Sequence, residues 1–152
     1  MLVGSTAAAA PAVDTVTLDG QFELGPIAPM VEGSIHYEHR FADSSVGLTV
    51  RGMGGVGAYL DDSATTFSSW SGLVGIRKHG ELHGYGELEV GVIGLRNDRS
   101  IGDELEHYGV EWHVLPAAQG TLGVRFGPVD FGFVVQVPTV GIGLHLGIAI
   151  DG

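Results

Sequence analysis

The sequence contains no cysteine and only one lysine, Lys78. The absence of cysteine excludes disulfide bonds and thiolate chemistry. Seven Lys and Arg residues stand against eighteen Asp and Glu residues, which gives a formal net charge of −11. This balance disfavours nucleic acid, or anionic lipid, as a partner held by charge. Only 16% of the residues are charged, against about 25% in ordinary soluble domains, which indicates a surface not wholly in contact with water.

Long hydrophobic runs are also missing. No stretch approaches the ~18 consecutive apolar residues of a transmembrane helix, so any membrane span must be built from strands. The Ala-rich start includes Ala10-Pro11-Ala12, a small-x-small arrangement of the kind that signal peptidase reads. We interpret residues 1–13 as either a signal-peptide remnant or a flexible tail, and residues 14–152 as one domain.

From Thr15 onward the sequence shows instead an alternation of apolar with polar or small residues, which predicts strands. Nine segments show it, with short turns at residues 42–45, 79–81 and 116–119 and longer loops at 60–66 and 96–105. Short turns that alternate with longer loops are typical of outer-membrane barrels, which normally have an even number of strands. Eight strands follow if two segments near the C-terminus form one bent strand, and ten are the alternative.

The polar face of these segments is rich in glycine and contains no lysine, unlike the solvent face of a soluble sheet. Inside a small closed barrel, glycine leaves room where opposite walls converge, and charged groups bond across the lumen. We therefore predict a lumen network of Arg51, Arg77, Arg125, Glu87, Glu89, Glu111, His83, His113, His145 and Tyr85. The apolar face then meets lipid, with Ile142, Leu144, Leu146, Ile148, Val124, Phe126, Val90 and Trp112 as predicted lipid-facing residues.

This pattern resembles the small outer-membrane β-barrel family, typified by outer membrane proteins A, X and W, over Thr15 to Ile150. The resemblance is one of pattern, without a shared diagnostic motif. It implies an all-β fold, namely a closed antiparallel up-and-down transmembrane barrel in the bacterial outer membrane. It also implies an Arg–Glu lumen network, which falls here on Arg51, Arg125, Glu87 and Glu111.

Motifs for catalysis or metal binding are weak. His36 and His39 of "HYEH" lie three apart, so a strand would point them to opposite faces, away from one shared metal ion. "GMGGVG" at residues 52–57 lacks the following helix and the Lys-Ser/Thr of a phosphate-binding loop. No nucleophile elbow is present. We therefore expect no enzyme activity, no cofactor and no metal.

The predicted function is structural or surface-interactive. The barrel would sit among membrane lipids and hold two long loops, in which Asp61, Asp62, Asp98 and Asp103 would meet a surface ligand. A narrow, cation-preferring, porin-like channel is the leading alternative, because the inferred lumen is acidic. A soluble barrel that carries a small ligand, or a self-assembling β protein, is the alternative from another class. The oligomeric state is left open.

Overall fold

The computed structural model describes residues 11–25, 29–58, 66–98, 112–139 and 141–152, and these form eight strands. The strands are β1 (Val13–Leu24), β2 (Pro29–Arg40), β3 (Val46–Ala58), β4 (Thr66–His79), β5 (Gly84–Asp98), β6 (His113–Phe126), β7 (Val129–Val137) and β8 (Gly141–Asp151). The first of them begins within the predicted tail, of which residues 1–10 lie outside the described part of the chain. No helix among the described residues has the length and hydrophobicity of a membrane span.

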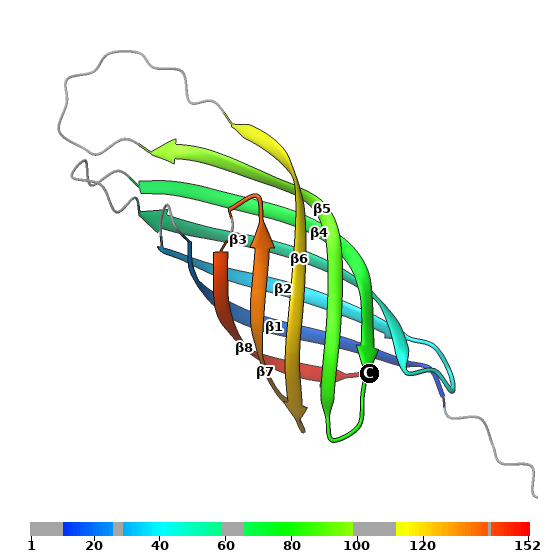
Figure 1. Cartoon of the computed structure of the whole chain (residues 1–152). Coiled ribbons are helices and arrows are strands. Elements are labelled where there is room, and N and C mark those ends of the chain that lie inside the picture. Colours follow the sequence, from blue (N-terminus) through cyan, green and yellow to red (C-terminus); the bar gives the residue numbers. More distant parts are fainter. Residues whose placement is uncertain (1–10, 26–28, 59–65, 99–111, 140) are drawn as a thin grey trace, which may run out of the picture.

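Each strand pairs antiparallel with its neighbour in sequence, and β8 pairs with β1 to close the barrel. Figure 1 shows the strands inclined and wrapped into one cylinder. The closing pair runs from Thr15 opposite Asp151 to Leu24 opposite Ile142. The predicted closed up-and-down barrel is therefore confirmed, with eight strands rather than ten.

The two ends of the barrel differ in the length of their connections. At the short-turn end, residues 41–45, 80–83 and 127–128 join the strands. Gly127 has a φ of 59° in its two-residue connection, a conformation that glycine adopts at little cost. The long-loop end carries the connections at 25–28, 59–65, 99–112 and 138–140. Both β1 and the end of β8 reach the short-turn end, where the Gly152 amide donates to the Asp14 carbonyl at 2.9 Å.

The predicted turn at 116–119 is wrong, because β6 runs unbroken through Pro116. Proline cannot donate a ladder hydrogen bond and is therefore tolerated mainly at strand edges. The β6 strand pairs with β7 only from Ala118 onward, so Pro116 has a sheet neighbour on β5 alone. Two of the nine predicted segments are thus one strand, and the third short turn lies at 127–128.

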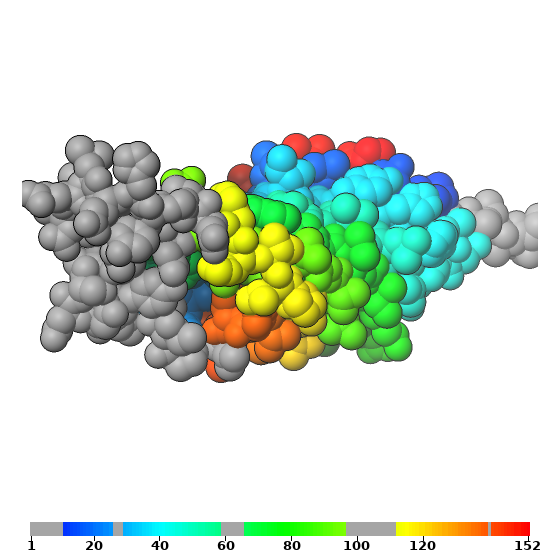
Figure 2. All heavy atoms as spheres, turned by 90° about the horizontal axis from the view of Figure 1, so that it is seen from above, coloured from blue at the N-terminus to red at the C-terminus, as the bar shows by residue number. Residues whose placement is uncertain are grey.

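The burial pattern is inverted relative to a soluble sheet. In β8, for example, Leu146 and Ile148 face outward and are about 60% exposed, whereas His145, between Leu144 and Leu146 in the sequence, faces inward and is 1% exposed. The same alternation repeats in β1, β2 and β7. Figure 2 shows side chains of neighbouring strands lying closely against one another on one outer face. The exposed apolar side chains of all these strands together form a belt around the outside of the barrel.

Inward glycines allow the walls to approach large polar side chains. A Cβ at Gly132 would lie 2.6 Å from His145 Nε2 and 2.9 Å from the Leu122 carbonyl oxygen. The lumen also contains apolar side chains toward the long-loop end. Two clusters are present among the described residues, one of Met53, Leu73, Ile93 and Ala117 and one of Met30 and Phe67, and Leu95 packs against both.

Candidate functional site

The centre of the lumen is occupied by Arg51 of β3. Its Nε donates to Glu89 at 2.8 Å, one terminal nitrogen donates to Glu87 at 2.5 Å, and the other donates to Asp19 at 3.3 Å. The side chains of all four residues are at most 1% exposed. A planar guanidinium that divides its donors among three carboxylates gives strong, directional, charge-assisted bonds.

A second arginine, Arg77 of β4, extends this network toward the short-turn end. Its Nε donates to Glu87 at 2.5 Å, and a terminal nitrogen donates to Asp130 of β7 at 3.1 Å. The same nitrogen lies 3.7 Å from a Glu38 oxygen. Glu87 therefore bridges the two arginines, one through each carboxylate oxygen.

Tyr85 completes the network beneath Arg77. The Arg77 guanidinium lies 4.0 Å from the centre of the Tyr85 ring, which is cation–π geometry. The Tyr85 hydroxyl donates to Asp130 and lies 2.7 Å from His145 Nε2. These contacts join β4, β5, β7 and β8, and those of Arg51 join β1, β3 and β5. Apart from the bond between Arg77 and Glu87, whose strands are paired, these bonds cross the lumen between strands that are not neighbours. Polar side chains therefore occupy this half of the barrel.

Negative charge is in excess inside the barrel. Among the described residues, the buried acids are Asp19, Glu23, Glu32, Glu38, Glu87, Glu89 and Asp130, and the buried arginines are Arg51 and Arg77. Seven carboxyl groups against two guanidinium groups leave an excess of five negative charges if every acid is ionised and histidine is neutral. The excess is uneven, because both arginines bond to acids in the central and short-turn parts of the lumen.

Three predicted lumen residues lie at the ends of the barrel instead. Arg125 is at the short-turn rim, where it donates to the Gly127 carbonyl and to Asp151, whose side chain is 57% exposed. His83 is an exposed turn residue with a φ of 66°. His113 is exposed and starts β6, five residues before the β6–β7 ladder begins at Ala118. Glu111 lies outside the described residues.

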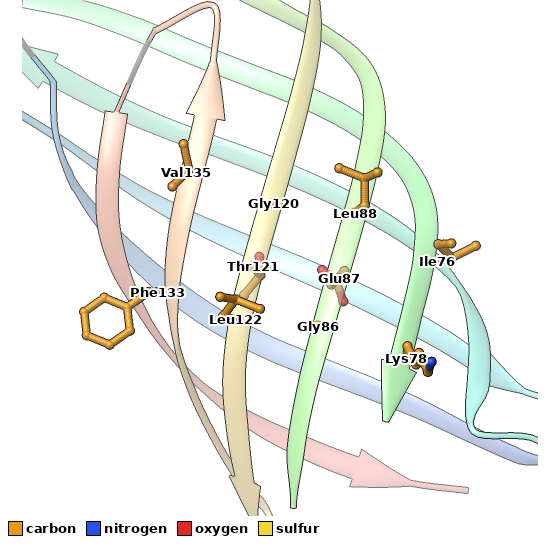
Figure 3. Close-up of a pocket in the computed structure, with 10 residues that line it drawn as sticks. All are labelled: Ile76, Lys78, Gly86, Glu87, Leu88, Gly120, Thr121, Leu122, Phe133 and Val135. Atoms are coloured by element: carbon orange, nitrogen blue, oxygen red, sulfur yellow. The ribbon is translucent and has the colours of Figure 1, made fainter. Parts of the chain in front are cut away.

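The predicted lipid-facing residues lie on the outer surface. Seven of them are between 43% and 63% exposed, namely Ile142, Leu144, Leu146, Ile148, Phe126, Val90 and Trp112. Val124 is half-buried. Figure 3 shows an outer groove over β4 to β7, in which Leu88, Leu122 and Phe133 surround positions Gly86 and Gly120. Lys78 lies at the end of this groove nearest the short turns.

The predicted loop residues lie at or beyond the ends of the described strands. Asp61, Asp62 and Asp103 lie outside the described residues. Asp98 ends β5, so that strand extends into the predicted loop at 96–105.

His36 and His39 point to opposite faces, as the strand period requires. The His36 side chain is fully buried, and the His39 side chain is 38% exposed and bonds to Asp14. His36 instead meets Glu87 and Glu89, and one potential ligand atom from each lies within 4.8 Å of the others. Both carboxylates already bind arginine, so a cation at this position would compete with Arg51 and Arg77 for the same oxygens.

Asp130 was not among the predicted lumen residues, although it holds both Arg77 and Tyr85. Its place follows from the alternation in β7, where Phe131 and Phe133 face outward and Asp130, Gly132 and Gln136 face inward. The signal was present in the sequence, but Asp130 follows Gly127-Pro128 after a single residue and resembles part of the turn.

A closed eight-stranded barrel with an apolar exterior, a polar filled interior and unequal loops defines the class: this is a β-barrel of the outer-membrane type. The chain is similar to the crystal structure of Ail, the attachment invasion locus protein of Yersinia pestis, with a TM-score of 0.62 and 9% identity over 93% of this chain and 97% of that one. A structure of Ail in complex with the heparin analogue sucrose octasulfate matches with a TM-score of 0.54 and 12% identity, over 93% and 97% of the two chains.

The N-terminal β-barrel domain of Pseudomonas aeruginosa OprF is also similar, with a TM-score of 0.50 and 13% identity over 95% of this chain and 99% of that one. The predicted likeness to small outer-membrane barrels is thereby confirmed at the level of the fold. Scans against protein-family models and curated proteins gave no match.

Proposed function

We propose that this chain is a non-conducting barrel of the bacterial outer membrane that anchors its long-loop end at the cell surface. The observation that carries the proposal is the bonding of Arg51 and Arg77 across the lumen to acids on β1, β5 and β7. Side chains of an eight-stranded barrel are already enough to fill its interior. The apolar outer belt supports a lipid environment, and it disfavours a soluble carrier, which would expose this whole belt to water.

Electrical recording from planar bilayers tests directly whether ions pass through the lumen. The refolded protein is expected to insert without steady single-channel conductance, because Arg51 and the carboxylates that it bonds to occupy the centre of the lumen. Insertion is verified separately by protease protection of the strands in vesicles. Steady, cation-selective conductance of the inserted protein would contradict the proposal and favour the porin-like alternative.

The acidic sequence of the two longest connections supports the binding of a positively charged ligand at the cell surface. Residues 59–65 and 99–111 contain six acidic residues, and Arg99 is their only Lys or Arg. The Ail structure with sucrose octasulfate holds an anionic ligand, whereas the acidic connections of this chain would repel one. We therefore infer a basic segment of a partner protein as the ligand class.

Cells that display the protein are expected to bind a labelled oligolysine peptide and to bind labelled heparin no better than control cells. Replacing Asp61, Asp62, Asp103 and Glu104 with their amides should lower oligolysine binding at least severalfold, because the attraction is electrostatic and screened by salt. The matched control replaces Glu81, in a turn at the opposite end, with glutamine. Equal loss of binding in the control, or preferential heparin binding, would contradict the proposed ligand class.

A further inference from the structure

Two buried glutamates in the long-loop half of the lumen form no ion pair with any described residue. Glu23 of β1 is 1% exposed and Glu32 of β2 is 2% exposed. Glu23 accepts a bond from the Gln21 amide nitrogen, and Glu32 accepts one from the Ser69 hydroxyl at 2.8 Å. One oxygen of each carboxylate has no hydrogen-bond partner. Burying an ionised carboxylate without a compensating charge is costly, so these groups require a cation or a proton.

The two carboxylates share one region of the lumen. Gln21 stands directly opposite Glu32 in the β1–β2 ladder, and Glu23 lies two residues further along the same inward face of β1. Glu23 and Glu32 are therefore diagonal neighbours, within reach of one another for long side chains. The Glu23 carboxylate lies over Gly141 of β8, where any Cβ would collide with it.

Uncharged oxygen donors face the same region. Gln136 of β7 is the ladder partner of Gly141, and Gln119 of β6 is the ladder partner of Gln136. Gln136 is 0% exposed and Gln119 is 1% exposed, yet neither the oxygen nor the nitrogen of either amide has a partner. The Gln21 side-chain oxygen is also unpartnered. Buried polar atoms are normally satisfied, so a group of unpartnered ones beside two carboxylates indicates a bound ligand.

We propose that Glu23 and Glu32 bind one calcium ion inside the barrel, with amide oxygens of Gln21 and Gln136 and water as further ligands. Calcium takes six to eight oxygen ligands, among them carboxylates, amide carbonyls and water, in flexible geometry. Two carboxylates balance its charge. The site differs from His36, Glu87 and Glu89, whose carboxylates are bonded to arginine. A filled calcium site is also compatible with a barrel that conducts ions, so this inference is independent of the proposed function.

The test uses the refolded full chain in detergent, freed of divalent ions with a chelator and desalted. Atomic emission is expected to find one calcium per chain after equilibration with calcium chloride. The midpoint of thermal unfolding should rise saturably, by about 5–10 °C at a hundredfold excess over the dissociation constant. Sodium chloride at matched ionic strength should not reproduce that shift.

The double variant Glu23→Gln/Glu32→Gln removes both charges with little change in shape and is expected to lose the bound calcium and the calcium-dependent shift. The control Glu81→Gln, an exposed turn residue at the opposite end, should keep both. Gln136→Leu provides a second variant if the double variant does not fold, and should weaken calcium binding severalfold. Absence of bound calcium in the unaltered chain would overturn the proposal and assign protons to the glutamates. Retention of calcium by the double variant, or an unchanged calcium affinity of Gln136→Leu, would overturn it as well.

Discussion

Arg51→Leu is expected to destabilise the barrel by about 3–5 kcal/mol, because it leaves three buried acids without their shared cation. Arg51 donates to Glu89 at 2.8 Å, to Glu87 at 2.5 Å and to Asp19 at 3.3 Å, and the side chains of all four residues are at most 1% exposed. The measurement is the free energy of unfolding in urea, with the protein in lipid vesicles. Arg51→Lys should give an intermediate loss, since an ammonium cannot reproduce the planar donor geometry.

Arg125→Leu is the matched control for this experiment. Arg125 also bonds to a carboxylate, that of Asp151, but at the rim where water reaches the acid. Its loss should cost no more than about 1 kcal/mol, as for other exposed ion pairs. Combining Arg51→Leu with Glu89→Gln should recover part of the loss, because one of the stranded charges is removed. Equal costs for Arg51→Leu and Arg125→Leu would show that the central network does not hold the barrel together.

Val90→Arg should destabilise the barrel by about 2–4 kcal/mol, the cost of placing a cation on the lipid face at the middle of a bilayer. Val90 is 54% exposed and lies near the middle of β5, on the apolar outside. Val129→Arg is the control, because Val129 starts β7 beside the short turn and is 44% exposed. Near the membrane interface the expected cost is about 0–1 kcal/mol.

The comparison of these two variants tests which solvent the outer belt meets. In vesicles the loss of unfolding free energy should depend on how deep in the bilayer the arginine lies. Val90→Arg should therefore unfold at a clearly lower urea concentration than Val129→Arg. A belt in contact with water would tolerate arginine equally at both positions. Similar, small costs for the two variants would therefore contradict the transmembrane assignment.

The alternation in the sequence was sufficient to predict a closed barrel and which face of most strands is apolar. In β8 the period of two sends Ile142 and Leu144 outward and His145 inward without any tertiary information. The same rule places Arg51, Arg77 and Glu87 inside, because successive side chains in a strand point to opposite faces. The alternation did not determine the number of strands, because Pro116 resembles a turn signal when its sheet neighbours are unknown.

Tertiary structure alone decided which of the inward-directed residues are enclosed, and which bond to one another. His113 and Arg125 have polar side chains in plausible positions of the alternation, but each lies at an end of the barrel, one where β6 begins and the other beside the turn at 127–128. Asp130 meets Arg77 across 53 residues of sequence. A local period fixes the direction of a side chain, whereas its burial and its partners depend on strand lengths and register, which are set only when the sheet closes on itself.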